Sequence, residues 1–103
     1  MSLNDLDPLL QPPKRLAVLG VLANNLEVEF AFLRTLLELS DSDLSKQMSV
    51  LVKADYAASR KVGKGRNRQT WYKITSTGKE SLQQHIVALN MLIEQAPSAP
   101  QAN

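Results

Sequence analysis

Half of the positive charge in this sequence lies in one segment of 14 residues. The chain has 12 Lys and Arg against 10 Asp and Glu. Six of the basic residues fall in this segment, with no acidic residue among them: Arg60, Lys61, Lys64, Arg66, Arg68 and Lys73. The six basic and ten acidic residues outside it give the rest of the chain a net charge of −4. Such a concentration of cations is expected where a protein binds a phosphate backbone. The alternative is a basic hairpin tip that serves only solubility and edge protection.

Other chemistries lack the residues that they need. The sequence has no cysteine, which excludes disulfides, thiolate zinc sites and iron–sulfur clusters. His85 is the only histidine, so a transition-metal site would lack ligands, and we expect His85 at the surface or in an interface. No Ser/His/Asp or Cys/His set for nucleophilic catalysis can be assembled. The sequence therefore predicts no enzymatic activity, no catalytic residue, no metal and no cofactor.

Length and hydropathy predict one globular domain. The chain has 103 residues, of which 44% are hydrophobic and 21% charged. The longest hydrophobic run, 16–23, has eight residues, whereas a membrane span needs about 20. The N-terminal segment carries acidic residues and no basic one, unlike a secretory signal. We expect a cytoplasmic protein.

Capping residues and hydrophobic periodicity predict the elements that position the basic segment. Helices are expected at about 13–24, 29–37 and 41–54, then a hairpin over 56–74 and a long helix over 76–95. Ser40 and Thr75 are the expected N-caps of the third and last helices. Residues 26–29 are expected to be briefly extended. Trp71 and Tyr72 face opposite sides of one strand, so one of them should pack on the core. The fold class is mainly α with a small hairpin (α+β), with an arm over 1–12, a domain over 13–95 and a disordered tail over 96–103.

This order of elements describes a winged helix-turn-helix, in which the third helix lies in the DNA major groove and the hairpin, or wing, contacts the backbone or minor groove. Ser and Gln can read base edges, and Lys can hold phosphate or guanine. The expected recognition-helix contacts are Ser42, Ser45, Lys46, Gln47, Ser49 and Lys53. The expected wing contacts are Arg60, Lys61, Lys64, Arg66 and Arg68. A plain solvated helix face is the alternative.

Segments 39–48 (LSDSDLSKQM), 51–56 and 70–78 (TWYKITSTG) carry a resemblance to a known family. They are similar to single-domain bacterial winged-helix transcriptional regulators, MarR/ArsR-like in architecture and closest to the "winged helix DNA-binding domain" group. The resemblance covers about residues 7–93 and implies a homodimer that binds a pseudo-palindromic operator. The family tends to have glycine where this chain has Glu38 and Asp55. Asp tolerates a left-handed conformation better than Glu does, so Glu38 is expected to change the turn before the third helix.

The last helix carries a seam of apolar residues: Leu82, Ile86, Leu89, Leu92 and Ile93. Met91 broadens this seam. Three short helices cannot cover all of this seam, which predicts that a second protomer does. The alternative is that the seam packs back on its own domain.

The sequence thus predicts a sequence-specific, double-stranded DNA-binding transcriptional regulator that acts as a homodimeric repressor. Steric occlusion of a promoter is the simplest action for so small a protein. A small-molecule effector stays open as a further partner. The rival hypothesis is a winged-helix protein–protein interaction module that does not bind DNA.

Overall fold

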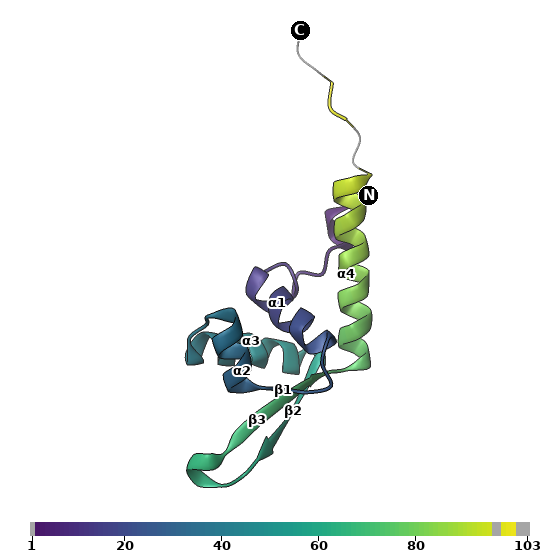
Figure 1. The fold of residues 1–103 in the computed structure, drawn as a ribbon. Helices are drawn as coiled ribbons and strands as arrows, with labels where there is room; N and C mark the ends of the chain where they lie inside the picture. The colour runs from purple at the N-terminus through teal and green to yellow at the C-terminus, as the bar shows by residue number, and fades with distance from the viewer. Residues whose placement is uncertain (1, 96–97, 101–103) are drawn as a thin grey trace.

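The computed structural model describes residues 2–95 and 98–100 and has the predicted order of elements (Figure 1). The helices are η1 (Leu3–Asp5, a 3-10 turn), α1 (Pro13–Ala23), α2 (Phe30–Leu37), α3 (Asp41–Lys53), η2 (Gly65–Asn67, a 3-10 turn) and α4 (Ser76–Glu94). The strands are β1 (Val28–Glu29), β2 (Ala57–Val62) and β3 (Gln69–Ile74). The winged-helix fold class is confirmed, and the four α-helices end within one residue of the predicted limits. The predicted disordered tail lies largely outside the described residues.

The sheet has three strands, one more than the predicted hairpin. Its order is β1-β3-β2, and both pairings are antiparallel. β2 and β3 form the hairpin, in a register that runs from Ala57 opposite Ile74 to Val62 opposite Gln69. The added strand, β1, places Val28 opposite Tyr72 and Glu29 opposite Trp71. The alternation of apolar and acidic residues over 26–30 indicated an extended link, but it could not reveal the pairing with β3, whose Tyr72 is 44 residues after Val28.

The hydrophobic core lies where the helices meet the base of the sheet. Its fully buried aliphatic side chains come from the segment before α1 and from α1, α2 and α3: Leu10, Val18, Leu19, Leu22, Leu33, Leu44 and Leu51. Tyr72 is the aromatic residue of β3 that faces this core, and its ring centroid is 6.4 Å from that of Phe30. Trp71 is half-buried on the opposite side of the strand.

Side-chain caps fix where α3 and α4 begin, as predicted. Ser40 Oγ accepts a hydrogen bond from the Asp43 backbone N–H at 3.1 Å. Thr75 Oγ1 accepts one from the Gly78 N–H at 2.9 Å. Each cap satisfies a backbone donor that the first helical turn leaves without a partner.

Two residues that are not glycine adopt the left-handed conformation. Glu38, after α2, has φ 55° and ψ 43°, and Asp55, after α3, has φ 62°. These are the two positions where the family tends to have glycine. Glu38 was expected to change this turn, because Glu rarely adopts the left-handed conformation. Instead, Glu38 adopts the left-handed conformation that glycine favours at this position. For a residue with a Cβ atom this conformation costs about 1–2 kcal/mol.

We expect Glu38→Gly to stabilise the domain by about 0.5–1 kcal/mol, because relief of the left-handed strain exceeds the backbone entropy that glycine loses on folding. Glu38 is exposed, and no described residue forms an ion pair with it. Urea unfolding followed by circular dichroism would measure the change. Lys46→Gly is the matched control: it places glycine at an exposed position inside α3 and should lower stability by about 0.5–1 kcal/mol. If Glu38→Gly lowers the free energy of unfolding, Glu38 is not strained by its left-handed conformation.

Candidate nucleic-acid interface

α3 buries one face and exposes the other. Leu44, Met48 and Leu51 are in the core. Five of the six predicted recognition residues are exposed: Ser42, Ser45, Lys46, Ser49 and Lys53. The sixth, Gln47, is half-buried, and its Nε2 donates to Asp43 Oδ1 at 2.9 Å. The helix therefore presents three serine hydroxyls and two lysines on one accessible surface, whereas the Gln47 amide is hydrogen-bonded to Asp43.

The first turn of α3 carries two carboxylates, each paired with a cation from an earlier helix. Asp41 Oδ1 accepts from Arg34 Nη1 of α2 at 2.8 Å. Asp43 pairs with Lys14 of α1, and hydrogen bonds from Lys14 and Gln47 hold the pKa of the Asp43 carboxyl below its usual value. These pairs offset negative charge that would repel a polyanion, and they connect the start of α3 to α1 and α2. From the sequence, both aspartates were attributed to helix capping and the helix dipole alone. The ion pairs were not predicted, because Arg34 is 7 residues from Asp41 and Lys14 is 29 residues from Asp43.

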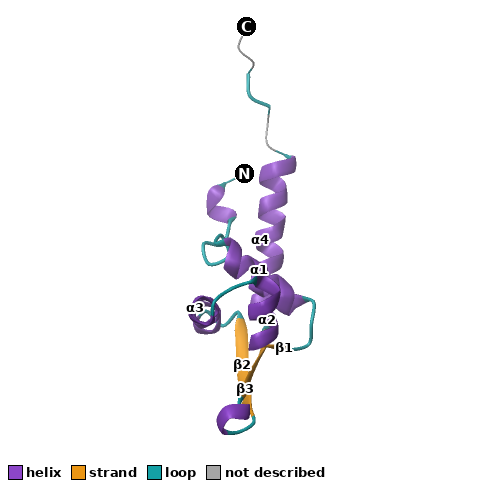
Figure 2. Cartoon of the chain, turned by 60° about the vertical axis from the view of Figure 1, so that its left-hand side comes forward, coloured by secondary structure: helices purple, strands orange, loops and turns teal. Residues whose placement is uncertain are grey.

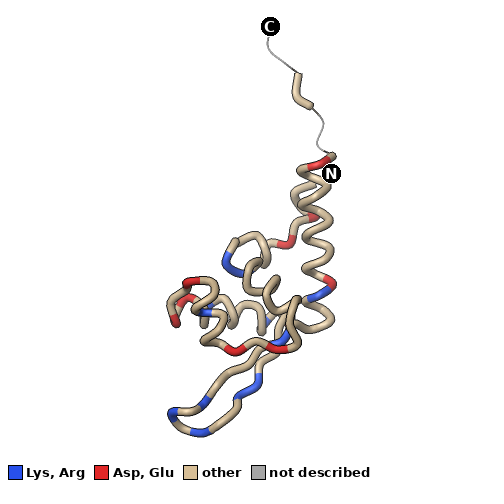
Figure 3. The backbone as a smooth tube through the Cα atoms, viewed as in Figure 1, with Lys and Arg blue, Asp and Glu red and all other residues tan. Residues whose placement is uncertain are grey.

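The wing extends beyond the helical body, as two views agree (Figures 1 and 2). Its tip carries lysine and arginine and no acidic residue (Figure 3). Lys61, Lys64, Arg66 and Arg68 are exposed and form no ion pair with any described residue. Gly63 shapes the tip: its φ is 86°, and a Cβ there would lie 2.5 Å from the Asn67 carbonyl oxygen. The fold thus presents four cations together at the end of a projecting hairpin.

Arg60, the fifth predicted wing residue, lies midway along β2, opposite Trp71 of β3, and is paired. Its Nε and Nη2 donate to the two carboxylate oxygens of Glu27 at 2.7 and 2.9 Å. This bond is the main cause of the lowered pKa of the Glu27 carboxyl. The guanidinium carbon also lies 6.0 Å from the centroid of the Trp71 ring, within cation–π range. Arg60 therefore connects β2 to the segment before β1, unlike the four cations at the tip.

The predicted seam of α4 divides between two environments. Leu82 is 8% exposed and belongs to the domain's own core, so its assignment to a dimer seam is wrong. Leu89 and Leu92 are half-buried, whereas Ile86 and Ile93 are 44% and 76% exposed. Leu82 and Leu89 are seven residues apart and lie on the same face of α4, yet only Leu82 is in the core. Spacing along the helix therefore cannot show which of them is buried within the domain. Met91, which was predicted to broaden the seam, is exposed, and so is Val87, which was not part of it.

His85 is buried, contrary to the surface or interface position expected from the sequence. Only 2% of it is exposed, and its Nδ1 accepts a hydrogen bond from the Asp7 backbone N–H at 3.0 Å. The partner lies 78 residues away in the N-terminal segment, so no local pattern could have revealed it.

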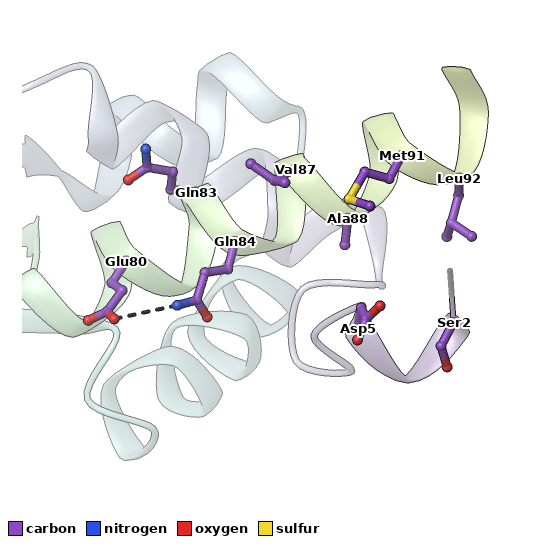
Figure 4. Close-up of a pocket in the computed structure, with 9 residues that line it drawn as sticks. All are labelled: Ser2, Asp5, Glu80, Gln83, Gln84, Val87, Ala88, Met91 and Leu92. Atoms are coloured by element: carbon purple, nitrogen blue, oxygen red, sulfur yellow. Dashed lines mark hydrogen bonds between the residues drawn. The ribbon is translucent and has the colours of Figure 1, made fainter. Parts of the chain in front are cut away.

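A groove of about 640 Å³ lies between the N-terminal segment and α4 (Figure 4). Val87, Ala88, Met91 and Leu92 form its apolar part on α4. Glu80, Gln83 and Gln84 of α4 form the polar part of the groove, where Gln84 Nε2 donates to Glu80 Oε1 at 3.4 Å. Ser2 and Asp5 line the opposite side of the groove (Figure 4). The accessible apolar surface of α4 thus lies at the end of the molecule opposite the wing tip (Figure 1).

Two further searches of the described residues were negative. Within 2–95 and 98–100, no three His, Asp or Glu side chains group as ligands for a metal ion. In the same part of the chain, no helix is both long and apolar enough to cross a membrane.

Comparison with known proteins places this geometry in a family. A search of the curated proteins found no match. Among solved structures, a transcriptional regulator homologue from Pyrococcus horikoshii superposes with a TM-score of 0.79 at 22% identity, covering 87% of this chain and 89% of that one. Rv0081 from M. tuberculosis gives a TM-score of 0.70 at 26% identity, covering 84% of each chain. HlyU from Vibrio cholerae gives 0.62 at 25% identity, covering 84% of this chain and 86% of that one.

The family model described as "winged helix DNA-binding domain" matches residues 14–93, from the start of α1 to the end of α4. The match includes α3, the wing and α4. This chain belongs to the winged helix DNA-binding domain family.

Proposed function

We propose that this protein is a sequence-specific, double-stranded DNA-binding transcriptional regulator. The observation that carries the proposal is a group of four exposed cations that form no ion pair with any described residue, Lys61 near the end of β2 and Lys64, Arg66 and Arg68 at the wing tip, on a hairpin that packs beside α3. Membership of a DNA-binding family supports it. Phosphate contacts supply affinity that does not depend on sequence, and side chains in the major groove supply specificity.

The roles of the residues follow from where they lie. The exposed face of α3 enters the major groove and presents Ser42, Ser45, Lys46 and Ser49 to base edges, while Lys53 near its C-terminal end contacts phosphate. Gln47 reaches a base edge only when its amide leaves the hydrogen bond to Asp43. Lys61, Lys64, Arg66 and Arg68 contact phosphates or the minor groove. Arg60 supports the middle of the hairpin, since its guanidinium is already paired with Glu27.

Fluorescence anisotropy with a labelled random duplex tests DNA binding directly. We expect binding at about 50 mM salt that weakens by orders of magnitude at about 200 mM, as release of condensed counterions requires. Absence of binding at the lower salt would remove the DNA hypothesis. The protein-interaction module would then be the better reading, and a search for protein partners would follow.

The same proposal includes a homodimer that represses by blocking a promoter. Ile86, Val87, Met91 and Ile93 expose apolar surface on α4, at the opposite end of the molecule from the wing tip. A second copy that covers this surface leaves both wings free. Two linked modules also gain affinity through effective concentration, which a single small domain lacks.

We expect Val87→Lys combined with Met91→Lys to convert the dimer into a folded monomer, because two charges would be buried in an apolar interface. Sedimentation velocity would measure the mass, and circular dichroism the fold. Leu36→Lys is the matched control, since Leu36 is an apolar residue of α2 that is 52% exposed. If the control dissociates and the α4 variant does not, the dimer forms through α2 instead.

A further inference from the structure

The N-terminal segment is built into the fold although it precedes the residues that match the family. The match begins at residue 14, whereas η1 lies beside α4 in two views and the chain after it turns toward α1 (Figures 1 and 2). Leu10 is completely buried in the core. We call residues 2–10 the arm.

Asp7 connects the arm to two distant elements. Its backbone N–H donates to His85 Nδ1 of α4 at 3.0 Å. Its carboxylate Oδ2 accepts from the Tyr56 hydroxyl at 2.5 Å. Oδ1 accepts from the Leu9 N–H at 2.9 Å, which fixes the carboxylate within the arm. Because His85 Nδ1 acts as an acceptor, it carries no hydrogen, and this hydrogen bond requires the Nε2–H form of the neutral ring.

Tyr56 is the last of the three residues that connect α3 to the wing. It lies between the end of α3 at Lys53 and the start of β2 at Ala57. Its N–H donates to the Leu51 carbonyl of α3 at 2.9 Å. Burial and the hydrogen bond to Asp7 raise the pKa of its hydroxyl. Asp7 therefore links α4 to the connection between the two elements proposed to contact DNA.

The link from His85 through Asp7 to Tyr56 attaches α4 to the connection between α3 and the wing at a second point. At its start, the Thr75 N–H donates to the Tyr56 carbonyl at 3.1 Å, and Thr75 Oγ1 donates to the Asp55 carbonyl at 2.5 Å. His85 lies nine residues beyond Ser76, which is about 14 Å along the helix. α1 packs against α4 as well. Attachment at one end leaves the direction of a helix adjustable, whereas a second attachment far from the first fixes it.

We propose that Asp7 is a positioning residue that sets the direction of α4 relative to α3 and the wing. In the dimer, the direction of α4 determines how far apart the two α3 helices lie. That distance must match the spacing of two half-sites, about 34 Å for neighbouring turns of the double helix. The consequence for DNA rests on the proposed function, but the positioning itself does not.

A spin-label distance measurement tests the positioning without DNA. The chain has no cysteine, so Ser59→Cys on β2 and Asn90→Cys on α4 give one labelled pair at two exposed positions. Dilution with unlabelled protein restricts the measurement to distances within a protomer. We expect Asp7→Ala and Tyr56→Phe to shift or broaden the distance distribution, and Asp7→Asn to restore it, because the amide oxygen can accept from the Leu9 N–H while the amide NH2 donates to the Tyr56 hydroxyl oxygen.

Asp5→Ala is the matched control, because it removes an arm carboxylate that has no hydrogen bond or ion pair in the described part of the chain. It should leave the distribution unchanged. Wild-type distributions in both Asp7→Ala and Tyr56→Phe, with only a lower melting temperature, would overturn the proposal by reducing Asp7 to a stabilising contact. If Asp7→Ala does not fold, Tyr56→Phe decides alone, since it removes only one hydroxyl.

A second readout separates positioning from DNA binding. On a duplex that the wild-type protein selects from a random library, unlabelled Tyr56→Phe should lose about 10-fold or more in affinity, because two sites must be engaged together. On a random duplex its affinity should change by less than about 2-fold, because phosphate contacts tolerate a changed separation. Equal losses on both duplexes would contradict positioning. A wild-type protein that binds neither duplex would remove the proposed function, and the spin-label result would still stand.

Discussion

Gly78→Ala is expected to destabilise the domain by about 3 kcal/mol or more, since its new methyl group would collide with backbone rather than with a movable side chain. A Cβ at this position would lie 2.1 Å from the Tyr56 carbonyl oxygen, 2.9 Å from its carbon and 3.0 Å from Ile74 Cγ1. The helix cannot move away freely, because the same Tyr56 oxygen accepts from the Thr75 N–H. The glycine in the Ile-Thr-x-x-Gly segment is therefore required by the close contact between the first turn of α4 and the chain after α3.

Chemical unfolding, with the midpoint and slope compared to the wild type, would measure this loss. Gly20→Ala is the matched control, since Gly20 is the glycine inside α1 and a Cβ there meets nothing within 4 Å. Alanine favours the helix, so the control should be more stable by about 0.5–1 kcal/mol. A Gly78→Ala protein as stable as the wild type would mean that α4 does not approach Tyr56 as closely as the structure has it.

Local signals were sufficient to predict most of the fold. The N-caps Ser40 and Thr75 lie immediately before α3 and α4, and the change from helical to alternating periodicity after α3 marks β2. Each of these signals involves residues within about four positions of one another, where backbone geometry alone dictates which side chains meet. The element order and the winged-helix fold follow from such signals, whereas the family was identified by the resemblance of segments 39–48, 51–56 and 70–78. β1 was predicted only as a brief extended link, since its pairing with β3 joins residues more than 40 positions apart.

The features that the sequence did not reveal depend on residues far apart in the chain. The ion pairs Lys14–Asp43 and Glu27–Arg60 join separate elements, and the hydrogen bond to His85 comes from the arm. Leu82 belongs to the core whereas Ile86 is exposed, and spacing along one helix cannot indicate where its contact with the rest of the domain ends. Composition located the basic segment, but it could not distinguish Arg60, which is paired with Glu27, from the wing cations that form no ion pair with any residue the structure describes.

The wing variant Lys64→Ala combined with Arg66→Ala is expected to bind random duplex DNA about 100-fold more weakly at about 50 mM salt. Counterion release contributes about a tenfold factor in affinity for each phosphate contact at this salt concentration, and the variant removes two cations. Both side chains are exposed at the tip and have no ion pair with described residues, so their loss should leave the fold intact. Anisotropy titrations over a series of salt concentrations would measure affinity and slope together.

The slope distinguishes phosphate contacts from a general loss of positive charge. Plotted as log affinity against log salt, it should flatten by about 2 units in the wing variant, and by a similar amount for every duplex sequence. Lys73→Ala combined with Lys79→Ala changes the net charge equally, but these two exposed residues lie beside the loop after α1, away from the tip. Direct phosphate contacts predict that this control keeps the wild-type slope, whereas long-range attraction to the net charge predicts that both variants weaken alike. An unchanged slope in the wing variant would exclude the tip from the DNA interface and leave binding to α3 alone.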